Sequence, residues 1–344
     1  MDDAVALSQR LFQAGLACAE LMSCYLGTRL GLYEHLRDDP ATPDGLAERA
    51  GVDARYAREW LEQQAVAGIL TVREGVYALP PGHAAALTDP DSPTSVAALA
   101  LLPVGGIAAA LPDLVEAFRT GGGVDSFGEA ADRGGFNRAV FRHDLPGWLR
   151  SGLPGLHRRL REHGGRIADL ACGAGWSTAA LAEEFPLAVV HGFDLDPGAV
   201  AAATATARAR GVADRVRVRV RDVADPVPER YDLVCLFDAL HDMPHPVEVL
   251  RACRALRTDR GAVLLMEPRA AHAFTAPGDE VERFLYAVSV LHCLPAGMRT
   301  RPSAATGAVL RPDRLREYAR QAGFSDVEVL PARHRFHRLY LAVG

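Results

Sequence analysis

The stretch Asp169-Leu170-Ala171-Cys172-Gly173-Ala174-Gly175 decides the fold, because it joins an apolar run at 167–170 to a helix-like segment that starts near Ser177. A Gly-rich turn between a strand and a helix lies at the carboxyl edge of a parallel sheet, where nucleotides bind. Dinucleotide-binding proteins also place small residues in this turn. Alone, the stretch predicts a nucleotide-binding α/β domain without identifying the nucleotide.

Short apolar runs alternate with helical segments on both sides of this turn. Alternation of this kind predicts a parallel sheet, with strands at 167–170, 188–193, 216–220, 232–237 and 262–266. Two further runs, 327–330 and 335–343, are joined by a link too short for a parallel crossover. We therefore expect an α/β fold whose seven-stranded, Rossmann-like sheet has an antiparallel last strand.

Acidic residues stand at the ends of the first three expected strands. Asp194 follows Asp169 by 25 positions, where a carboxylate can accept both ribose hydroxyl protons. Asp222 follows the third strand, where a carboxylate can accept from an adenine amino group. A dinucleotide fingerprint read from Gly173 would need a small residue at 178, where Thr178 stands instead. One acid is usually a solvated strand end, but three together indicate a ligand site.

The run 169–175, the segment Gly192-Phe-Asp-Leu-Asp196 and Asp222 together resemble class I S-adenosylmethionine-dependent methyltransferases. The resemblance implies S-adenosylmethionine as cofactor, with Asp194 at the ribose, Leu195 and Val223 at the adenine faces, and the Phe237 carbonyl at the adenine amino group. The cofactor-binding residues expected on this basis are Asp169, Ala171, Gly173, Gly175, Asp194, Leu195, Asp222, Val223 and Phe237. Ala171 departs from the family pattern, in which glycine is usual at this position.

The N-terminal part is expected to form a long helix followed by a winged helix. Thr42 and Asp53 begin two short helices, and strand-like runs at 69–72 and 76–79 flank a turn. Residues 42–80 carry four arginines against six acids, and the whole chain has a net charge of −5 and a pI near 6.2. A protein with this balance repels phosphate, so we expect no nucleic-acid partner.

Further motifs resemble actinobacterial winged-helix methyltransferases of small molecules, which are similar to plant-type O-methyltransferases. These motifs are Glu59-Trp60-Leu61, Tyr77-Ala-Leu-Pro-Pro81, Phe237-Asp-Ala-Leu-His-Asp242 and Leu291-His-Cys293. The resemblance implies a homodimer formed through the N-terminal region. We expect three segments: a helical, winged-helix dimerisation domain at 1–90, a helical connector contributing to the acceptor pocket at 91–150, and the cofactor-binding catalytic domain at 151–344.

His241 is the candidate catalytic base. Methyl transfer from a sulfonium is an in-line displacement, and a hydroxyl acceptor must also lose a proton. His241-Asp242 follows the fourth strand and is similar to the His-Asp-Trp of plant-type O-methyltransferases, whose histidine is the base, although Met243 replaces the tryptophan. Glu267 ends the fifth strand and would orient His241. The alternatives are a histidine that only holds its loop and a plain strand-end acid.

No metal is expected. His241, Asp242 and His245 offer ligand types for a divalent cation that could hold a catechol-like acceptor. The two histidines bracket Pro244 at a helix entry, however, and no cluster of further acids accompanies them.

The acceptor pocket is assigned to the insertion at 270–305 and to aromatic residues of the connector. Loops at this edge of the sheet usually cover the substrate. Candidate substrate-binding residues are Phe136, Phe141, Trp148, Tyr286, His292, Met298 and Arg299. They would form a mostly apolar pocket for an aromatic or polyketide-like molecule, although aromatic residues also commonly belong to the core.

Together these features predict a cytoplasmic small-molecule O-methyltransferase of secondary metabolism. The N-terminus has no basic segment typical of a secretory signal, and the six cysteines show no Cys-x-x-Cys spacing. The most apolar window, 96–111, is shorter than the roughly 20 residues that span a bilayer, so no membrane partner is expected. Alternatives are N- or C-methylation, a cofactor-binding transcriptional regulator, and a rearrangement that keeps the methyl group.

Overall fold

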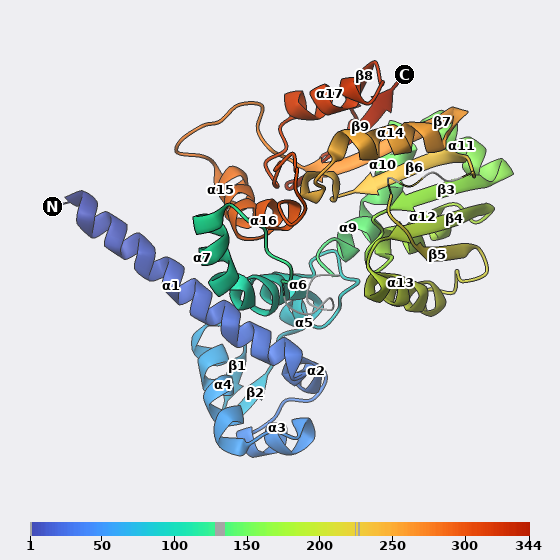
Figure 1. The fold of residues 1–344 in the computed structure, drawn as a ribbon. Helices are drawn as coiled ribbons and strands as arrows, with labels where there is room; N and C mark the ends of the chain where they lie inside the picture. Colours follow the sequence, from blue (N-terminus) through green and yellow to red (C-terminus); the bar gives the residue numbers. More distant parts are fainter. Residues whose placement is uncertain (1, 128–134, 224, 226–227) are drawn as a thin grey trace. The chain divides into compact units, whose positions relative to one another are not determined.

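Seven strands form one sheet in the order β5-β4-β3-β6-β7-β9-β8 (Figure 1). The strands are β3 (Gly165–Leu170), β4 (Ala188–Asp194), β5 (Val216–Val220), β6 (Tyr231–Phe237), β7 (Arg257–Pro268), β8 (Asp326–Val329) and β9 (His337–Val343). Neighbours are parallel except β9, which runs antiparallel to both β7 and β8. The expected seven-stranded sheet with a reversed last strand is confirmed.

This computed structural model describes residues 2–127, 135–223, 225 and 228–344. The chain divides into two compact units. The smaller consists of Met1–Ala109 with Ala131–Ala139, and the larger, which contains the seven-stranded sheet, consists of Ala110–Ala130 with Val140–Gly344. The segment 91–150, expected to be a connector, contributes to both.

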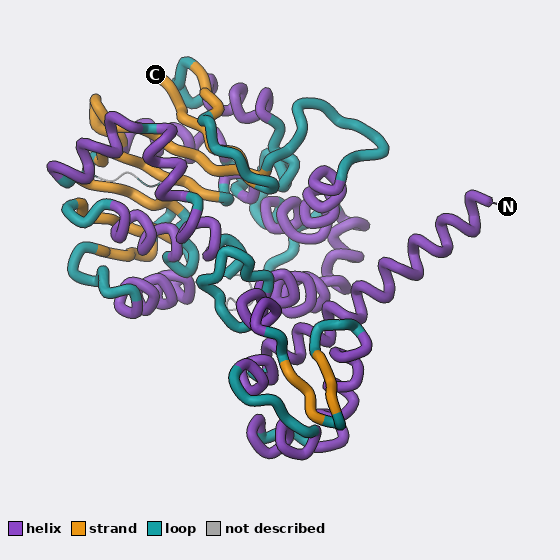
Figure 2. The backbone as a smooth tube through the Cα atoms, turned by 180° about the vertical axis from the view of Figure 1, so that it is seen from behind, coloured by secondary structure: helices purple, strands orange, loops and turns teal. Residues whose placement is uncertain are grey.

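Helices cover both faces of the sheet because alternate strand residues point to opposite sides. One core contains Ile167 and Leu233 and is covered by α10 (Leu145–Gly152), α11 (Pro154–His163), α12 (Trp176–Glu184) and α13 (Pro197–Ala209). The other contains Ala168 and Val234 and is covered by α14 (Pro246–Leu256) and α17 (Pro312–Gln321). Figure 2 shows this layering from behind.

The reversed strand places its first residues at the carboxyl edge of the sheet. Glu267 pairs with Arg338, and Pro268 pairs with His337. The start of β9 therefore lies beside the ends of β6 and β7, where the sequence predicts the catalytic residues.

The insertion after β7 is folded. It contains α15 (Glu280–Val288), the π-helical turn η4 (Ser289–Cys293) and α16 (Leu294–Gly297). Asp279 caps α15 by accepting from the Glu282 amide. Glu282 is buried and pairs with Arg311 at 3.2 Å, and Arg311 also donates to the Ala271 carbonyl. This buried pair anchors the insertion to the start of α17.

The smaller unit contains α1 (Asp2–Arg29), α2 (Leu32–Arg37), α3 (Pro43–Ala50), α4 (Ala54–Val66), β1 (Thr71–Arg73), β2 (Val76–Ala78) and α5 (Pro81–Leu87). Thr42 caps α3 and Asp53 caps α4, each accepting from backbone amides of the first turn. Glu74 and Gly75 both have positive φ, the geometry of a tight hairpin turn. The expected winged helix is present.

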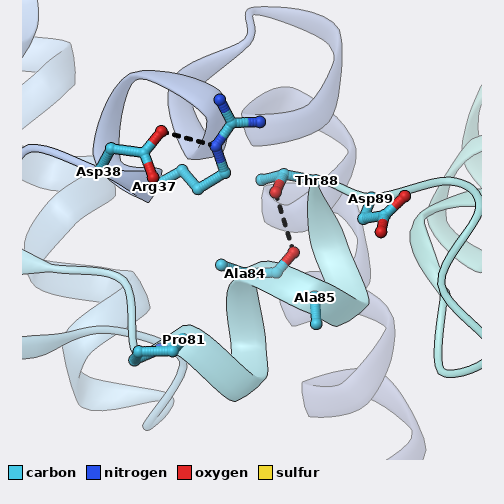
Figure 3. A pocket seen from close by; sticks show the side chains of 7 residues that line it. All are labelled: Arg37, Asp38, Pro81, Ala84, Ala85, Thr88 and Asp89. Carbon is cyan, nitrogen blue, oxygen red and sulfur yellow. Dashed lines mark hydrogen bonds and ion pairs between the residues drawn. The ribbon is translucent and has the colours of Figure 1, made fainter.

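A cavity of about 470 Å³ in the smaller unit is lined by Arg37, Asp38, Pro81, Ala84, Ala85, Thr88 and Asp89 (Figure 3). Arg37 pairs with Asp38 at 2.8 Å, and the Thr88 hydroxyl donates to the Ala84 carbonyl. None of the predicted site residues lines it.

The apolar window expected at 96–111 belongs to a longer helical segment. It comprises α6 (Ala97–Ala100), the π-helix η1 (Leu101–Ile107), the 3₁₀ turn η2 (Ala108–Ala110) and α7 (Leu111–Thr120), and α9 (Arg138–His143) follows. Residues 101–120 are long and apolar enough, by length and composition alone, to cross a membrane, a test that core helices also pass. Of the most apolar stretch within residues 101–120, 28% is buried. The apolar helical segment is therefore longer than the window that the sequence indicated.

Candidate active site

The turn after β3 is shaped by two glycines and an aspartate. Gly173 has a φ of 53°, and its amide donates to Asp194 Oδ2 at 2.8 Å. Gly175 has a φ of 77°, and a Cβ there would lie 2.7 Å from the Cβ of Ala203 on α13. Only glycine allows this approach of α12 to α13. Asp194, the last residue of β4, therefore holds in place the turn that follows β3.

Ala171 lies in the left-handed region of the backbone, with a φ of 52°. This is the position where the sequence departs from the usual glycine. L residues rarely adopt this conformation because Cβ approaches the following carbonyl oxygen. The turn thus keeps the backbone shape suited to glycine while carrying a methyl group.

Asp169 is buried beneath the turn. Its Oδ2 accepts hydrogen bonds from the hydroxyls of Ser177 (2.7 Å) and Thr178 (2.5 Å) on α12. Its Oδ1 has no hydrogen-bond partner within the described part of the chain. Burial raises the pKa of Asp169 to about 6, although the two hydroxyls oppose the shift. A buried carboxylate oxygen without a partner fits a cationic ligand group such as the amino group of a methionyl moiety.

The residues predicted to contact the adenine follow β4 and β5 or end β6. Leu195 is a large apolar side chain with 68% exposure, available to cover a flat ring. Val223 is half-buried against the core, and Asp222 is exposed beside it. Phe237 is buried and contacts Phe141, with ring centroids 5.7 Å apart. These positions fit an adenosine group, and they are the ones that the sequence predicts.

His241 and Glu267 form a buried hydrogen-bonded pair. His241 lies in the 3₁₀ turn η3 (Leu240–Asp242), and its Nδ1 is 2.7 Å from Glu267 Oε2. Glu267 Oε1 accepts from the Leu240 amide at 3.0 Å, so this carboxylate fixes both the turn and the ring. His241 Nε2 lies 3.3 Å from Asp242 Oδ1. His241 is 4% exposed and Glu267 is fully buried.

Burial alone would lower the pKa of His241, but the carboxylates of Asp242 and Glu267 outweigh burial and raise it well above its usual value. Burial also raises the pKa of Glu267, against the opposing effect of His241. Because the pKa values of both side chains are raised, the His241–Glu267 pair holds a proton near neutral pH.

The predicted acceptor residues have separate contacts. Trp148 is buried and meets His334 edge-on at 5.6 Å. His292 lies 4.4 Å from the Phe127 ring, and Met298 is half-buried. The remaining polar groups bond within the protein: Arg311 donates to the Tyr286 hydroxyl, and Arg299 donates to the carbonyls of Ala296 and Asp125.

Of this set, Phe141 contacts Phe237, one of the residues predicted to bind the cofactor. Phe136 belongs to the smaller unit. The acceptor-binding role of the seven residues stays a prediction.

Sequence reasoning missed three residues of the site. Ser177 and Thr178 bond Asp169, and hydroxyl residues in the first turn of the following helix were the available signal. Cys293 contacts His241 from the insertion. The two residues are 52 positions apart in the chain, and no sequence pattern indicates that they are in contact.

Known proteins match both parts of the chain. The family described as "Methyltransferase domain" matches residues 168–263, and the "Rv2258c-like winged HTH domain" matches residues 17–89. The ubiquinone biosynthesis O-methyltransferase of Nitrosospira multiformis is 30% identical over 187 residues, which are 53% of this chain and 71% of that protein. The chain belongs to the S-adenosylmethionine-dependent methyltransferases.

Solved structures of methyltransferases are similar in fold to this chain over nearly its whole length. Human N-acetylserotonin methyltransferase, in complex with SAM, is 19% identical with a TM-score of 0.71, over 98% of this chain and 97% of that one. The mitomycin 7-O-methyltransferase MmcR is 20% identical with a TM-score of 0.66, over 100% of both chains. At these identities the likeness concerns the fold.

The methyltransferase uses S-adenosylmethionine to methylate a small-molecule acceptor. When bound, the cofactor supplies an electrophilic methyl group on a sulfonium. The carboxyl edge of the sheet fits this group, because it holds the buried Asp169 oxygen that has no hydrogen-bond partner in the described part of the chain and the exposed Leu195.

Proposed function

We propose that this methyltransferase methylates a hydroxyl group, with His241 as the general base and Glu267 as the residue that positions it. The supporting observation is the buried 2.7 Å hydrogen bond between His241 Nδ1 and Glu267 Oε2. A histidine held through Nδ1 keeps Nε2 in a fixed direction for proton transfer. This histidine lies directly after β6, at the same edge of the sheet as the cofactor turn.

The pair supplies the proton-accepting step of the reaction. Once the proton that the pair holds has left for solvent, Nε2 can take the proton of the acceptor hydroxyl as the oxygen attacks the methyl carbon. The carboxylate of Glu267 stabilises the imidazolium that forms. The buried position of both groups keeps water from competing for that proton.

Nine residues would hold the cofactor. Asp169 would accept from the methionyl amino group, and Asp194 would accept from the ribose hydroxyls with the oxygen lone pairs that its two backbone donors leave free. The others would surround the methionyl tail and the adenine ring: Ala171, Gly173, Gly175, Leu195, Asp222, Val223 and Phe237.

The acceptor would be an aromatic molecule bound in an apolar pocket. Phe141 and Trp148 would form its wall on the side of the sheet, since they are buried aromatic residues near Phe237 and the start of β9. The remaining predicted members are Phe136, Tyr286, His292, Met298 and Arg299. A role in secondary metabolism is part of this proposal.

The test replaces the base and follows S-adenosylhomocysteine formation with a panel of phenols, anilines and carbon acids. We expect turnover with phenols and a loss of about 10²-fold or more in His241→Ala. His245→Ala is the matched control, because His245 is exposed at the entry of α14 and its side chain makes no cap hydrogen bond. A His241→Ala rate within a few-fold of wild type, or turnover confined to amines or carbon acids, would contradict the assignment.

We further propose that the enzyme is a cytoplasmic homodimer, assembled through α1, that binds no nucleic acid. The helix exposes a series of large apolar side chains: Val5, Leu7, Leu11, Phe12, Leu16 and Met22. A cavity of about 610 Å³ beside its C-terminal half is lined mainly by apolar groups, among them Leu26, Leu30 and Trp60. Exposed apolar surface of this kind marks an interface. The six cysteines form no disulfide, which accords with a reducing compartment.

Light scattering after size exclusion tests the dimer. Phe12, with 68% exposure, should be central to the interface, so Phe12→Glu is expected to yield a monomer, whereas the neighbouring Gln13→Glu should leave the dimer intact. A monomeric wild-type protein at micromolar concentration would refute the proposal. Absence of a shift with random duplex DNA at low salt is expected from the acidic balance of residues 42–80.

A further inference from the structure

Three different metal-ligating side chains converge beside the end of β6. Ligand atoms of His241, Asp242 and Cys293 all lie within 4.8 Å of one another. His241 and Cys293 are buried, at 4% and 5% exposure, and Asp242 is half-buried. Imidazole, carboxylate and thiolate are the ligand types that Zn²⁺ takes in proteins.

The environment of His241 matches that of a metal ligand. Histidines that bind metals usually donate the N–H of the other ring nitrogen to a carboxylate, which fixes the tautomer and the direction of the free lone pair. Glu267 provides such a carboxylate at 2.7 Å from Nδ1. Nε2 lies 3.3 Å from Asp242 Oδ1 without forming a hydrogen bond to it.

A second observation concerns Asp242. Its Oδ1 is buried and makes no hydrogen bond within the described part of the chain. From zinc–ligand lengths of about 2.0–2.3 Å, neighbouring ligand atoms in a tetrahedral site lie about 3.2–3.7 Å apart. His241 Nε2 and Asp242 Oδ1 are 3.3 Å apart and already have this spacing, and the sulfur of Cys293 lies within 4.8 Å of a ligand atom of each residue.

The backbone around the cluster is closely packed. The His241 carbonyl accepts from the Gly307 amide at 3.1 Å, and the Asp242 amide donates to Ala239. A Cβ at Gly297 would lie 3.1 Å from the Asp242 carbonyl oxygen, so α16 touches η3 through backbone atoms. Cys293 ends the π-helical turn that precedes α16. Packed backbone therefore holds His241 and Asp242 beside the turn that carries Cys293.

We propose that His241, Asp242 and Cys293 form a three-ligand site for Zn²⁺ or a similarly thiophilic divalent cation, with the fourth position open. Binding releases the thiol proton of Cys293, and any proton on Nε2, to solvent, because only the deprotonated groups are ligands. Metal binding itself is independent of the function proposed above. Its consequence rests on that function: a metal that holds the lone pair of Nε2 prevents His241 from accepting a proton, so Zn²⁺ inhibits methyl transfer reversibly.

The test is a titration of the full chain with Co²⁺ under anaerobic conditions, in a Cys18→Ser, Cys24→Ser background that removes the two less buried thiols of α1. A near-ultraviolet thiolate-to-cobalt charge-transfer band should saturate at about one equivalent and disappear when Zn²⁺ is added. Cys293→Ser should abolish the band. Cys253→Ser is the matched control, since Cys253 is equally buried on α14 and belongs to none of the metal-ligating groups found among the described residues.

Folding of each variant is checked by circular dichroism. Asp242→Asn, which keeps the thiol, should weaken Zn²⁺ binding by about tenfold or more. No band in the background protein, or a band that survives Cys293→Ser, would overturn the proposal.

A kinetic measurement separates this proposal from the assignment of the base. Zn²⁺ should inhibit S-adenosylhomocysteine formation in wild type, with recovery on adding a chelator, and should lose potency in Cys293→Ser relative to that variant's own metal-free rate. A cobalt band that requires Cys293, without any inhibition by Zn²⁺, supports the metal site and contradicts the role of His241 as base.

Discussion

Replacing Ala171 by glycine should leave the protein as stable as before or make it more stable, by up to about 1 kcal/mol. An L residue in the left-handed region costs about 1–2 kcal/mol, and Ala171 has a φ of 52°. Glycine removes this cost but loses about 0.5–1 kcal/mol through its greater freedom in the unfolded chain. The methyl group is only partly buried, so its loss costs a fraction of the ~0.8 kcal/mol of a fully buried carbon.

The matched control is Ala202→Gly on the exposed surface of α13. There the backbone is helical, and glycine should destabilise the protein by about 1 kcal/mol. The same substitution is thus expected to differ between the two positions by about 1–2 kcal/mol. Urea unfolding without cofactor measures the difference. It is followed by tryptophan fluorescence in a Trp60→Phe background, which leaves Trp148 and Trp176 of the larger unit.

A loss of stability in Ala171→Gly equal to that in Ala202→Gly would refute the reasoning. It would mean that the turn does not strain the alanine backbone. Calorimetric titration adds a second readout. The glycine variant should bind S-adenosylmethionine at least as tightly as wild type, because the side-chain methyl group of Ala171 narrows the space through which the methionyl tail approaches the turn. A tenfold weaker Kd would contradict this expectation.

Three further predictions concern the same edge of the sheet. Glu267→Gln should lower kcat by about 10²-fold or more with little change in the Kd of the cofactor. The reason is that the glutamine amide donates to Nδ1 of His241 and leaves the ring proton on Nε2, which then cannot accept one. Equal losses in kcat and in cofactor affinity would contradict this and indicate a general collapse of the site. Cofactor affinity should fall by up to about tenfold per pH unit below pH 6, since a protonated Asp169 no longer attracts the methionyl ammonium, and Asp169→Asn should remove this dependence in calorimetric titrations. Gly175→Ala should destabilise the larger unit by about 2 kcal/mol or more in urea unfolding, because its Cβ would lie 2.7 Å from Ala203; an unchanged midpoint would show that α12 can move away.

The sheet was predictable because its strands are short, buried and separated by helical periodicity. The expected strands agree with β3, β4, β5 and β6 within a few residues. β7 begins five residues before the expected position, since its first part, Arg257 to Gly261, is polar and reads as a loop. The π-helical turns η1 and η4 carry no sequence signal, because tertiary packing rather than local preference selects them.

The candidate site was predictable where motifs are local. Asp169, Asp194 and His241 each follow an apolar run, so their place at the carboxyl edge follows from the topology alone. The contact between His241 and Cys293 depends instead on how the insertion packs against η3. The left-handed backbone at Ala171 was equally hidden, because alanine gives no sign of positive φ.

The place of β9 within the sheet bears on how the protein is made. β9 follows both of its neighbours in the chain, yet it lies between β7 and β8. During synthesis β8 leaves the ribosome first and has no strand to pair with, while β7 keeps an open edge until β9 appears. Unpaired edges invite pairing with other chains. The sheet therefore exposes two unpaired edges at once until residues 337–343 pair, and a delay at this step favours association between chains.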